Sequence, residues 1–300
     1  HLCWPLHDPS HPRYDAKLKA EVGDIVEMTY VATDQAIGRI TAAVGPETMI
    51  VVLWSHGMAT NVTGTRMLDD VLLRLEGFTI PEGRANVRRA IHNAWLRAPK
   101  PIKNMIAPLR VKLWPRVRGK FLEVDRAKRR CFEVRNNDAT GGIRLNIKGR
   151  EPNGLLEPGA EAEAFTEQLI ADLKALVNPA TGKPAVLRIV KTRDVYPGEC
   201  SAGFPDLLID WNREDMLRAV TSEKTGLVEH KDMPTRSGDH RPVGLFMAKG
   251  PGLAPRHLNE RTSVYDFAPT LLAVLGLPSR LGTGKSIDTL VPPLQKVSQG

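Results

Sequence analysis

The spacing of apolar and polar residues predicts alternating helices and strands. Apolar residues recur with a period near 3.6, as expected for helices that bury one face, at residues 16–44, 67–75, 160–176 and 263–275. Shorter apolar or alternating runs predict strands at residues 48–54, 132–135, 143–147, 185–190, 207–211 and 244–248. Helices that alternate with strands indicate a layered α/β fold.

Residues 80–130 interrupt this pattern. Five prolines break the segment, and only a short basic amphipathic helix is expected within it, at residues 88–97. The sequence therefore predicts three parts: a first core segment at residues 1–79, a basic insertion or lid at 80–130, and a second core segment at 131–300.

The positive charge of the chain is concentrated in the same insertion. The formal net charge is +8, and residues 84–130 hold 15 of the 42 lysines and arginines against two acids. Three interpretations stay open: a solvated surface element, an attractor for an anionic substrate, or a contact with a membrane surface or nucleic acid. Only Trp95 and Trp114 favour the last of these. No nucleic-acid-binding motif accompanies them, so no specific nucleic acid is expected as a partner.

The composition indicates a folded protein without a transmembrane segment. A chain of 300 residues with 42% hydrophobic residues can form one large core or two smaller ones, and no run approaches the roughly 18 apolar residues that span a membrane. Cys3, Cys131 and Cys200 lack Cys-x-x-Cys spacing, so neither a disulfide framework nor a structural zinc site is expected. A cytoplasmic location fits best. Because the chain begins at His1, we expect a fragment or a processed product, and export stays open.

The stretch VVLWSHGMATN, residues 51–61, ends a predicted strand in polar residues. Its apolar run stops at Ser55, His56 and Gly57. In open α/β sheets ligands bind beyond the carboxyl ends of the strands, and an imidazole there can bind a metal or transfer a proton. The alternative, which is commoner for a histidine taken alone, is a side chain that caps a loop and bonds to the backbone.

A second candidate is the loop at residues 237–241, which precedes a predicted strand. It contains Asp239, His240 and Arg241. Such a loop can hold a metal and an anionic substrate together. The alternative is an ordinary polar turn.

A third candidate is the amino-terminal cluster of His1, His7, Asp8 and His11. His7 and His11 have the i, i+4 spacing that forms a metal pair on a helix. Nearby prolines make a helix unfavourable there, so a structured turn with satisfied side chains is favoured.

Three separated pieces resemble the alkaline-phosphatase superfamily, in its type I phosphodiesterase and nucleotide pyrophosphatase branch. They are HLCWPLHDPSHPRYD, then DQAIGRITAAVGPETMIVVLWSHGM, and then SGDHRPVGLFMAKGPGL followed by SVYDFAPTLLAVLGLP. The stretch GIRLNIKGREPNGLLEPGAE is similar to the predicted phosphohydrolases or phosphomutases of that superfamily. The resemblance covers nearly the whole chain apart from the basic insertion.

The resemblance implies a mostly parallel central sheet flanked by helices, with two divalent metals over its end. Zinc is the expected metal and manganese the alternative. His1 and His240 fall on ligands of one metal, His56 falls on a ligand of the second, and Arg241 is a weaker candidate for holding the anionic group. The implied activity is hydrolysis of a small phosphate monoester or diester, with a sulfate ester as an alternative, because two metals activate a nucleophile and stabilise the transferring group.

Two departures from the family pattern bear on activity. Ser55 stands where the family has an aspartate ligand, and a hydroxyl is a far weaker zinc ligand than a carboxylate. The nucleophile and the aspartate that partners His1 are expected upstream of His1, so the chain alone is expected to be inactive. The rival hypotheses are a degenerate, non-catalytic binding protein and an enzyme that works with one metal.

Residues 143–154 offer a last candidate for substrate recognition, because arginine can hold phosphate in a bidentate manner. The segment contains Arg144, Asn146, Lys148, Arg150 and Glu151. The favoured alternative is a strand and a sharp turn with exposed charges.

Overall fold

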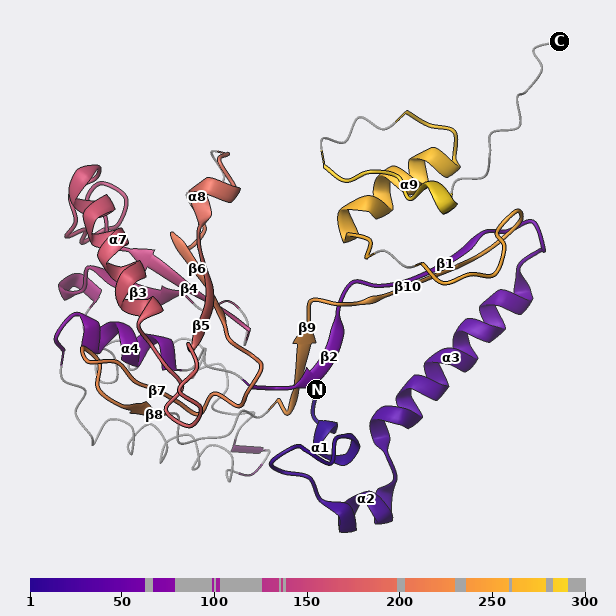
Figure 1. Cartoon of the computed structure of the whole chain (residues 1–300), viewed down its shortest axis with the longest axis horizontal. Coiled ribbons are helices and arrows are strands. Elements are labelled where there is room, and N and C mark those ends of the chain that lie inside the picture. Colours follow the sequence, from indigo (N-terminus) through magenta and orange to yellow (C-terminus); the bar gives the residue numbers. More distant parts are fainter. Residues whose placement is uncertain are drawn as a thin grey trace. The chain divides into compact units, whose positions relative to one another are not determined.

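The chain folds into two compact units. The computed structural model describes residues 1–62, 67–78, 99, 101–102, 126–134, 136, 139–198, 203–229, 236–258, 261–278 and 283–290. Unit 1 comprises His1–Thr60 and Arg236–Gly300, and unit 2 comprises Asn61–Thr235 (Figure 1). The basic segment 80–130, with Trp95 and Trp114, falls almost wholly outside the described residues.

Three helices begin unit 1: α1 (Trp4–His7), α2 (Ala16–Val22) and α3 (Ile25–Ala43). The single helix predicted at 16–44 is divided at Gly23, whose φ of 81° lies in the left-handed region that favours glycine. Asp15 and Asp24 then cap α2 and α3, because their carboxylates accept hydrogen bonds from the amides of Leu18 and Glu27.

Four strands of unit 1 form two antiparallel pairs, which follow one another along a single two-stranded ribbon. The strands are β1 (Ile50–Trp54), β2 (Gly57–Thr60), β9 (Gly238–Arg241) and β10 (Leu245–Lys249). β1 pairs with β10 and β2 with β9, and the pairing is interrupted between them. The two backbones approach closely there. A side chain at Gly244 would collide with the carbonyl of Trp54, and one at Gly57 with the carbonyl of Val243. Glycine at position 57 is therefore required by a close approach, and its φ is not positive.

Towards the end of unit 1 the described residues form one helix and two short 3-10 turns: η4 (Val264–Asp266), α9 (Phe267–Val274) and η5 (Asp288–Leu290). The helix predicted at 263–275 is thus confirmed. Ser263 and Asp266 form a capping box. The side chain of Ser263 accepts a hydrogen bond from the backbone amide of Asp266, and the carboxylate of Asp266 accepts one from the backbone amide of Ser263.

The described residues of unit 2 form these helices and strands: α4 (Leu68–Leu75), η2 (Arg126–Lys128), β3 (Cys131–Val134), β4 (Thr140–Leu145), α7 (Ala160–Lys174), β5 (Val186–Lys191), α8 (Thr192–Val195), β6 (Leu207–Trp211), β7 (Ala219–Val220) and β8 (Val228–Glu229). Strands β3, β4, β6 and β5 form a four-stranded antiparallel sheet in that order, and β7 pairs with β8 (Figure 1).

The hydrophobic core lies in unit 2. Along β6 the side chains of Leu207, Ile209 and Trp211 are buried, and those between them are less so, which is the alternation of a strand with one core face. These side chains belong to one cluster with residues of α4, β4 and α7. Among the described residues of unit 1, only Leu6 and Leu290 are buried hydrophobic side chains.

The observed fold class is mixed α/β, as predicted, but the mostly parallel central sheet is not seen. All the strand pairs of the described residues are antiparallel, apart from one isolated parallel bridge between Ile147 and Leu156. β1, whose apolar run resembled a buried strand, is only partly buried, because it lies in a two-stranded ribbon. In the described part of the chain, no helix is long and apolar enough to cross a membrane.

Candidate metal centre

Three histidines from distant parts of the chain meet beside the ribbon of unit 1. His1 is the first residue, His56 lies between β1 and β2, and His240 lies on β9. The Nε2 atoms of His1 and His240 are 3.2 Å apart. The ring of His56 stacks on that of His240, with 3.8 Å between the ring centroids and 23° between the planes. The three residues that the resemblance assigns as metal ligands are therefore brought together, and all three are exposed to solvent.

Backbone hydrogen bonds hold His1 in this position. Its carbonyl oxygen accepts from the amides of Ser237 and Gly238, each at 2.8 Å. The hydroxyl of Ser237 lies 2.9 Å from the carbonyl oxygens of both His1 and Leu2. The backbone of the first two residues is thus tied to the start of β9.

The tautomer of His1 directs a lone pair at His240. Nδ1 of His1 lies 2.8 Å from the carbonyl oxygen of Gly238, and because a carbonyl only accepts, Nδ1 carries the proton. In the neutral ring Nε2 then has a lone pair facing Nε2 of His240. Either His240 donates a proton across this gap, or both lone pairs face a shared cation. Tetrahedral zinc, with Zn–N bonds of about 2.0–2.1 Å, places two ligand nitrogens about 3.3 Å apart, so the observed separation fits.

His56 is oriented differently from the facing pair. Its Nδ1 lies 3.2 Å from the carbonyl oxygen of Gly57, which leaves Nε2 as an acceptor. Because its ring stacks on His240, its nitrogens lie in a separate layer from the His240 ring plane. Ser55 is exposed beside it. Among the described residues, no three His, Cys, Asp or Glu side chains are arranged to hold one metal ion. The geometry therefore provides one facing pair and one additional imidazole.

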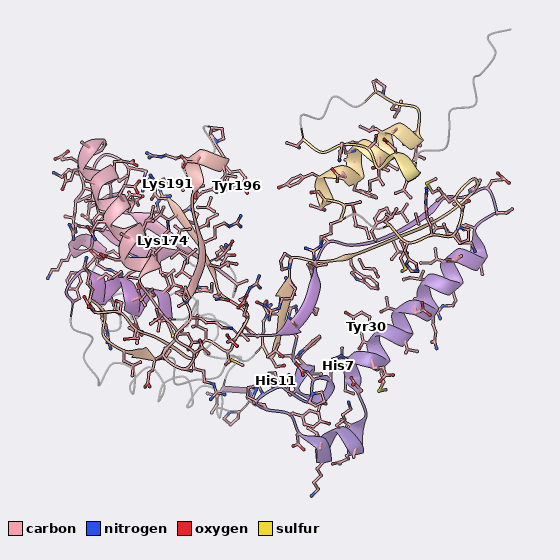
Figure 2. All side chains as sticks on the ribbon, in the orientation of Figure 1. His7, His11, Tyr30, Lys174, Lys191 and Tyr196 are labelled. Atoms are coloured by element: carbon pink, nitrogen blue, oxygen red, sulfur yellow. The ribbon has the colours of Figure 1, made fainter. Side chains whose placement is uncertain are left out.

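His7 does not join the histidine cluster. His7, which is labelled in Figure 2, bonds through Nδ1 to the carboxylate of Asp24 at 3.0 Å. Lys19 bonds to the same carboxylate at 3.1 Å. Burial raises the pKa of Asp24, but the hydrogen bonds from the Glu27 amide, His7 and Lys19 outweigh it and lower the pKa to about 2. His7 thus belongs to the start of α3.

Asp8 and His11 connect the amino-terminal segment to the strands that carry the cluster. Asp8 accepts a hydrogen bond of 2.6 Å from the hydroxyl of Thr60 on β2. His11 is only 4% exposed, its Nδ1 accepts from the amide of Arg13, and its ring bonds to the backbone of Ser237. Burial, and then the charge of Arg13, lower the pKa of His11. The interpretation of this segment as a turn with satisfied side chains is confirmed for both residues.

Acidification is expected to weaken the link between Asp8 and β2. Hydrogen bonds from Ser10 and then from Thr60 lower the pKa of Asp8 from 3.8 to about 2. Because the folded pKa lies below the unfolded one, the contribution to stability is complete above pH 3.8 and is lost as the pH falls through about 2. NMR titration of the Asp8 carboxyl carbon should give a midpoint near this value, and Thr60→Val should raise it. Equal midpoints in the two proteins would contradict the role of this hydrogen bond.

Arg241, the weaker candidate for binding the anionic group of a substrate, takes part in the packing of the ribbon. Its Nη2 donates to the carbonyl oxygen of Thr60 at 3.0 Å. Successive residues of a strand point to opposite faces, so Arg241 and His240 lie on opposite faces of β9. Binding of a substrate anion by Arg241 stays a prediction.

Residues 143–154 have a structural role in unit 2, as favoured. Arg150 holds Asp206 in a bidentate ion pair with distances of 2.6 and 2.7 Å, and Arg144 bonds to Glu151 at 2.5 Å. The side-chain amide of the buried Asn146 bonds to three backbone carbonyls, those of Arg126, Arg129 and Asn153. These contacts fix the turn that follows β4.

Three residues that position the cluster were not predicted. Ser237 anchors His1, Thr60 binds Asp8, and Gly244 permits the close approach of the strands beside His56. Only Gly244 has a signal in the sequence, as a glycine two residues after Pro242 at the start of a predicted strand. The two hydroxyls act through partners that are distant in the chain.

Comparisons with protein-family models, curated proteins and solved structures find no match. The geometry of the histidine cluster is therefore the observation that bears on function.

Proposed function

We propose that the histidine cluster of unit 1 binds a divalent metal ion, zinc in preference to manganese. We further propose that the complete protein uses it to hydrolyse small phosphate monoesters or diesters, or sulfate esters. Membership of the alkaline-phosphatase superfamily is part of this proposal. The observation that supports it is the meeting of His1, His56 and His240, which lie in the three separate motifs that resemble that superfamily.

The donor set suits such an ion. Imidazole is a good ligand for zinc, and the Nε2 atoms of His1 and His240 already lie at the separation of two ligands on one ion. The carbonyl of Gly238 fixes the tautomer and orientation of His1, as partners of metal-bound histidines commonly do. A divalent ion, when bound, lowers the pKa of a coordinated nucleophile and stabilises charge on the ester group.

His56 and Ser55 bear on a second ion. His56 offers one additional nitrogen, on a ring stacked above His240, and Ser55 offers a neutral hydroxyl where a carboxylate would bind more tightly. A second ion is therefore expected to bind more weakly than the first, and an enzyme with one metal is the nearest alternative.

The rival from another class is a non-catalytic protein that binds a metal or a ligand. The serine at position 55 favours it, because a neutral hydroxyl is a weaker metal ligand than a carboxylate and would leave the second ion weakly held. This rival predicts metal binding without turnover.

Calorimetric titration of the chelator-treated protein with zinc tests the metal centre. One tight site and a weaker second one are expected, a single site would favour the one-metal alternative, and absence of binding would reject the centre. Hydrolysis of p-nitrophenyl phosphate, bis(p-nitrophenyl) phosphate and p-nitrophenyl sulfate by the metal-loaded complete protein tests the reaction. Zinc binding with no turnover of any of the three would favour the non-catalytic rival.

A further inference from the structure

The amino-terminal segment, residues 1–14, is attached at two points to one residue of unit 1, Ser237. At the beginning of the segment, the amide of Ser237 donates to the carbonyl oxygen of His1, and its hydroxyl lies 2.9 Å from the carbonyl oxygens of His1 and Leu2. Further along, the ring of His11, which is labelled in Figure 2, bonds to the backbone of Ser237. The segment therefore folds back on the start of β9, and His11 closes the loop.

Both ring nitrogens of His11 have partners that require the neutral form. Nδ1 accepts a hydrogen bond of 3.0 Å from the amide of Arg13, so it carries no proton, and the proton of the neutral ring lies on Nε2. The amide of Ser237 already donates to His1, so the backbone group that bonds to the His11 ring is the carbonyl. A carbonyl only accepts, and Nε2–H is its donor.

A second proton on His11 is incompatible with this arrangement. It would go to Nδ1, where it would face the amide proton of Arg13, so that two donors oppose each other. The resulting charge would also be buried, because His11 is only 4% exposed, and burial of a charge without a partner is costly. Two charged groups of the described residues act on the ring, Arg13 against a positive charge and Asp8 in favour of one, whereas β9 contributes only the Ser237 backbone.

The balance of these effects favours the neutral ring. Burial, and then the charge of Arg13, lower the pKa of His11 from its ordinary value of 6.5, against the opposing effects of Asp8 and of the bond to Ser237. Because the folded pKa lies below the unfolded one, the neutral ring stabilises the attached segment fully above pH 6.5, and this contribution is lost as the pH falls through the lowered pKa. Asp8 stays ionised in that range, since its pKa is about 2.

We propose that His11 is a pH-sensitive latch, which holds residues 1–14 on β9 while its ring is neutral and releases them when its ring is protonated. Release removes one of the two attachments to Ser237 and loosens the other, so that His1 moves away from His240. The latch itself is a property of the fold. Its consequence, weaker metal binding in mild acid, rests on the proposed function.

Amide hydrogen exchange tests the latch without metal, in the complete protein with excess chelator. The amides of Ser237 and Gly238 each donate to the carbonyl oxygen of His1 at 2.8 Å, so they are protected while the latch is closed. NMR follows their protection and the titration of the His11 ring in the same samples. We expect both to change with one midpoint, below pH 6.5. Protection that persists after the His11 ring has been protonated overturns the proposal.

Three variants locate the response. His11→Gln keeps a donor and an acceptor but cannot be protonated, so the two amides should stay protected down to about pH 5. The matched control is His7→Gln, because His7 is an exposed histidine of the same segment that bonds to Asp24, and it should keep the natural midpoint. His240→Ala removes repulsion between the protonated rings of His1 and His240, and it should also keep the midpoint.

Loss of protection in His11→Gln at the natural midpoint, or disappearance of the response in His240→Ala, would overturn the latch. If glutamine leaves the amides unprotected at every pH, the coincidence of the two midpoints in the natural protein decides.

Zinc titration then measures the consequence for the metal centre. At the midpoint half of the natural protein is open, so its apparent affinity for zinc should be about twofold lower than that of His11→Gln, whereas at about pH 8 the two should be equal. Equal affinities at both pH values would mean that the latch does not act on the centre. Absence of zinc binding at every pH would reject the proposed centre and leave the exchange result for the latch unaffected.

Discussion

Replacing His240 with alanine is expected to lower the affinity for zinc by about a hundredfold or more. Its Nε2 lies 3.2 Å from that of His1, so its removal leaves one imidazole where two face each other. Loss of a residue that merely orients a metal ligand costs about 10–100-fold in affinity, and loss of the ligand itself should cost at least as much. The fold should survive, because the His240 side chain is exposed and its backbone pairing with Met58 is unaffected.

His1→Ala is expected to have the same effect, and the double variant should bind little more weakly than either single variant. The carbonyl of His1 accepts hydrogen bonds from the amides of Ser237 and Gly238, and these remain when the ring and its bond to the carbonyl of Gly238 are removed, so the amino-terminal segment stays in place. Two residues that hold one ion act together, and their effects are therefore not additive. His56→Ala should leave the tight site intact and remove the weaker one.

His257→Ala is the control, because His257 is an exposed histidine of unit 1 that is not part of the cluster. Calorimetric titration of the chelator-treated variants measures both affinity and stoichiometry. If His240→Ala binds zinc as the natural protein does, the contact between His1 and His240 is only a hydrogen bond. If His257→Ala weakens binding equally, zinc binds the histidines without a defined site.

Most elements of secondary structure were predictable, whereas their pairing was not. Helices α4 and α7 and strands β5, β6 and β10 lie within two residues of the predicted positions, because burial of one face imposes a period that can be read along the chain. The direction in which strands pair leaves no such period. The apolar run of β1 therefore resembled a buried parallel strand, although the structure places it in a two-stranded antiparallel ribbon.

The histidine cluster was predictable only through the resemblance to a family. Positions 1, 56 and 240 have no spacing that indicates proximity. They meet because β2 pairs with β9 in one register and because Ser237 binds the backbone of His1. Both are long-range contacts, and local sequence patterns do not report them. The segment 143–154 shows the reverse case, since its turn residues were enough to favour a structural role.

The two units differ in what stabilises them. In unit 1 the apolar residues of α3 and β10 are largely exposed, so its strand ladders, caps and hydrogen bonds carry most of the structure. In unit 2 a continuous apolar cluster joins the sheet to α4 and α7. Substitutions that open a cavity should therefore have their largest effects in unit 2.

Leu207→Ala is accordingly expected to destabilise unit 2 by about 3 kcal/mol, within the range of 2–5 kcal/mol found for large-to-small changes in cores. Leu207 is 0% exposed at the start of β6, where it pairs with Ile143 of β4 and with Lys191 of β5, so neighbouring side chains cannot collapse into the space it leaves. Leu187→Ala on the adjacent strand is the matched control, because Leu187 is 71% exposed and should change stability by less than about 0.5 kcal/mol. Urea denaturation and hydrogen exchange of the β6 amides measure the loss of stability in the two variants. Equal effects of the two substitutions would mean that the apolar cluster is not the core of this unit.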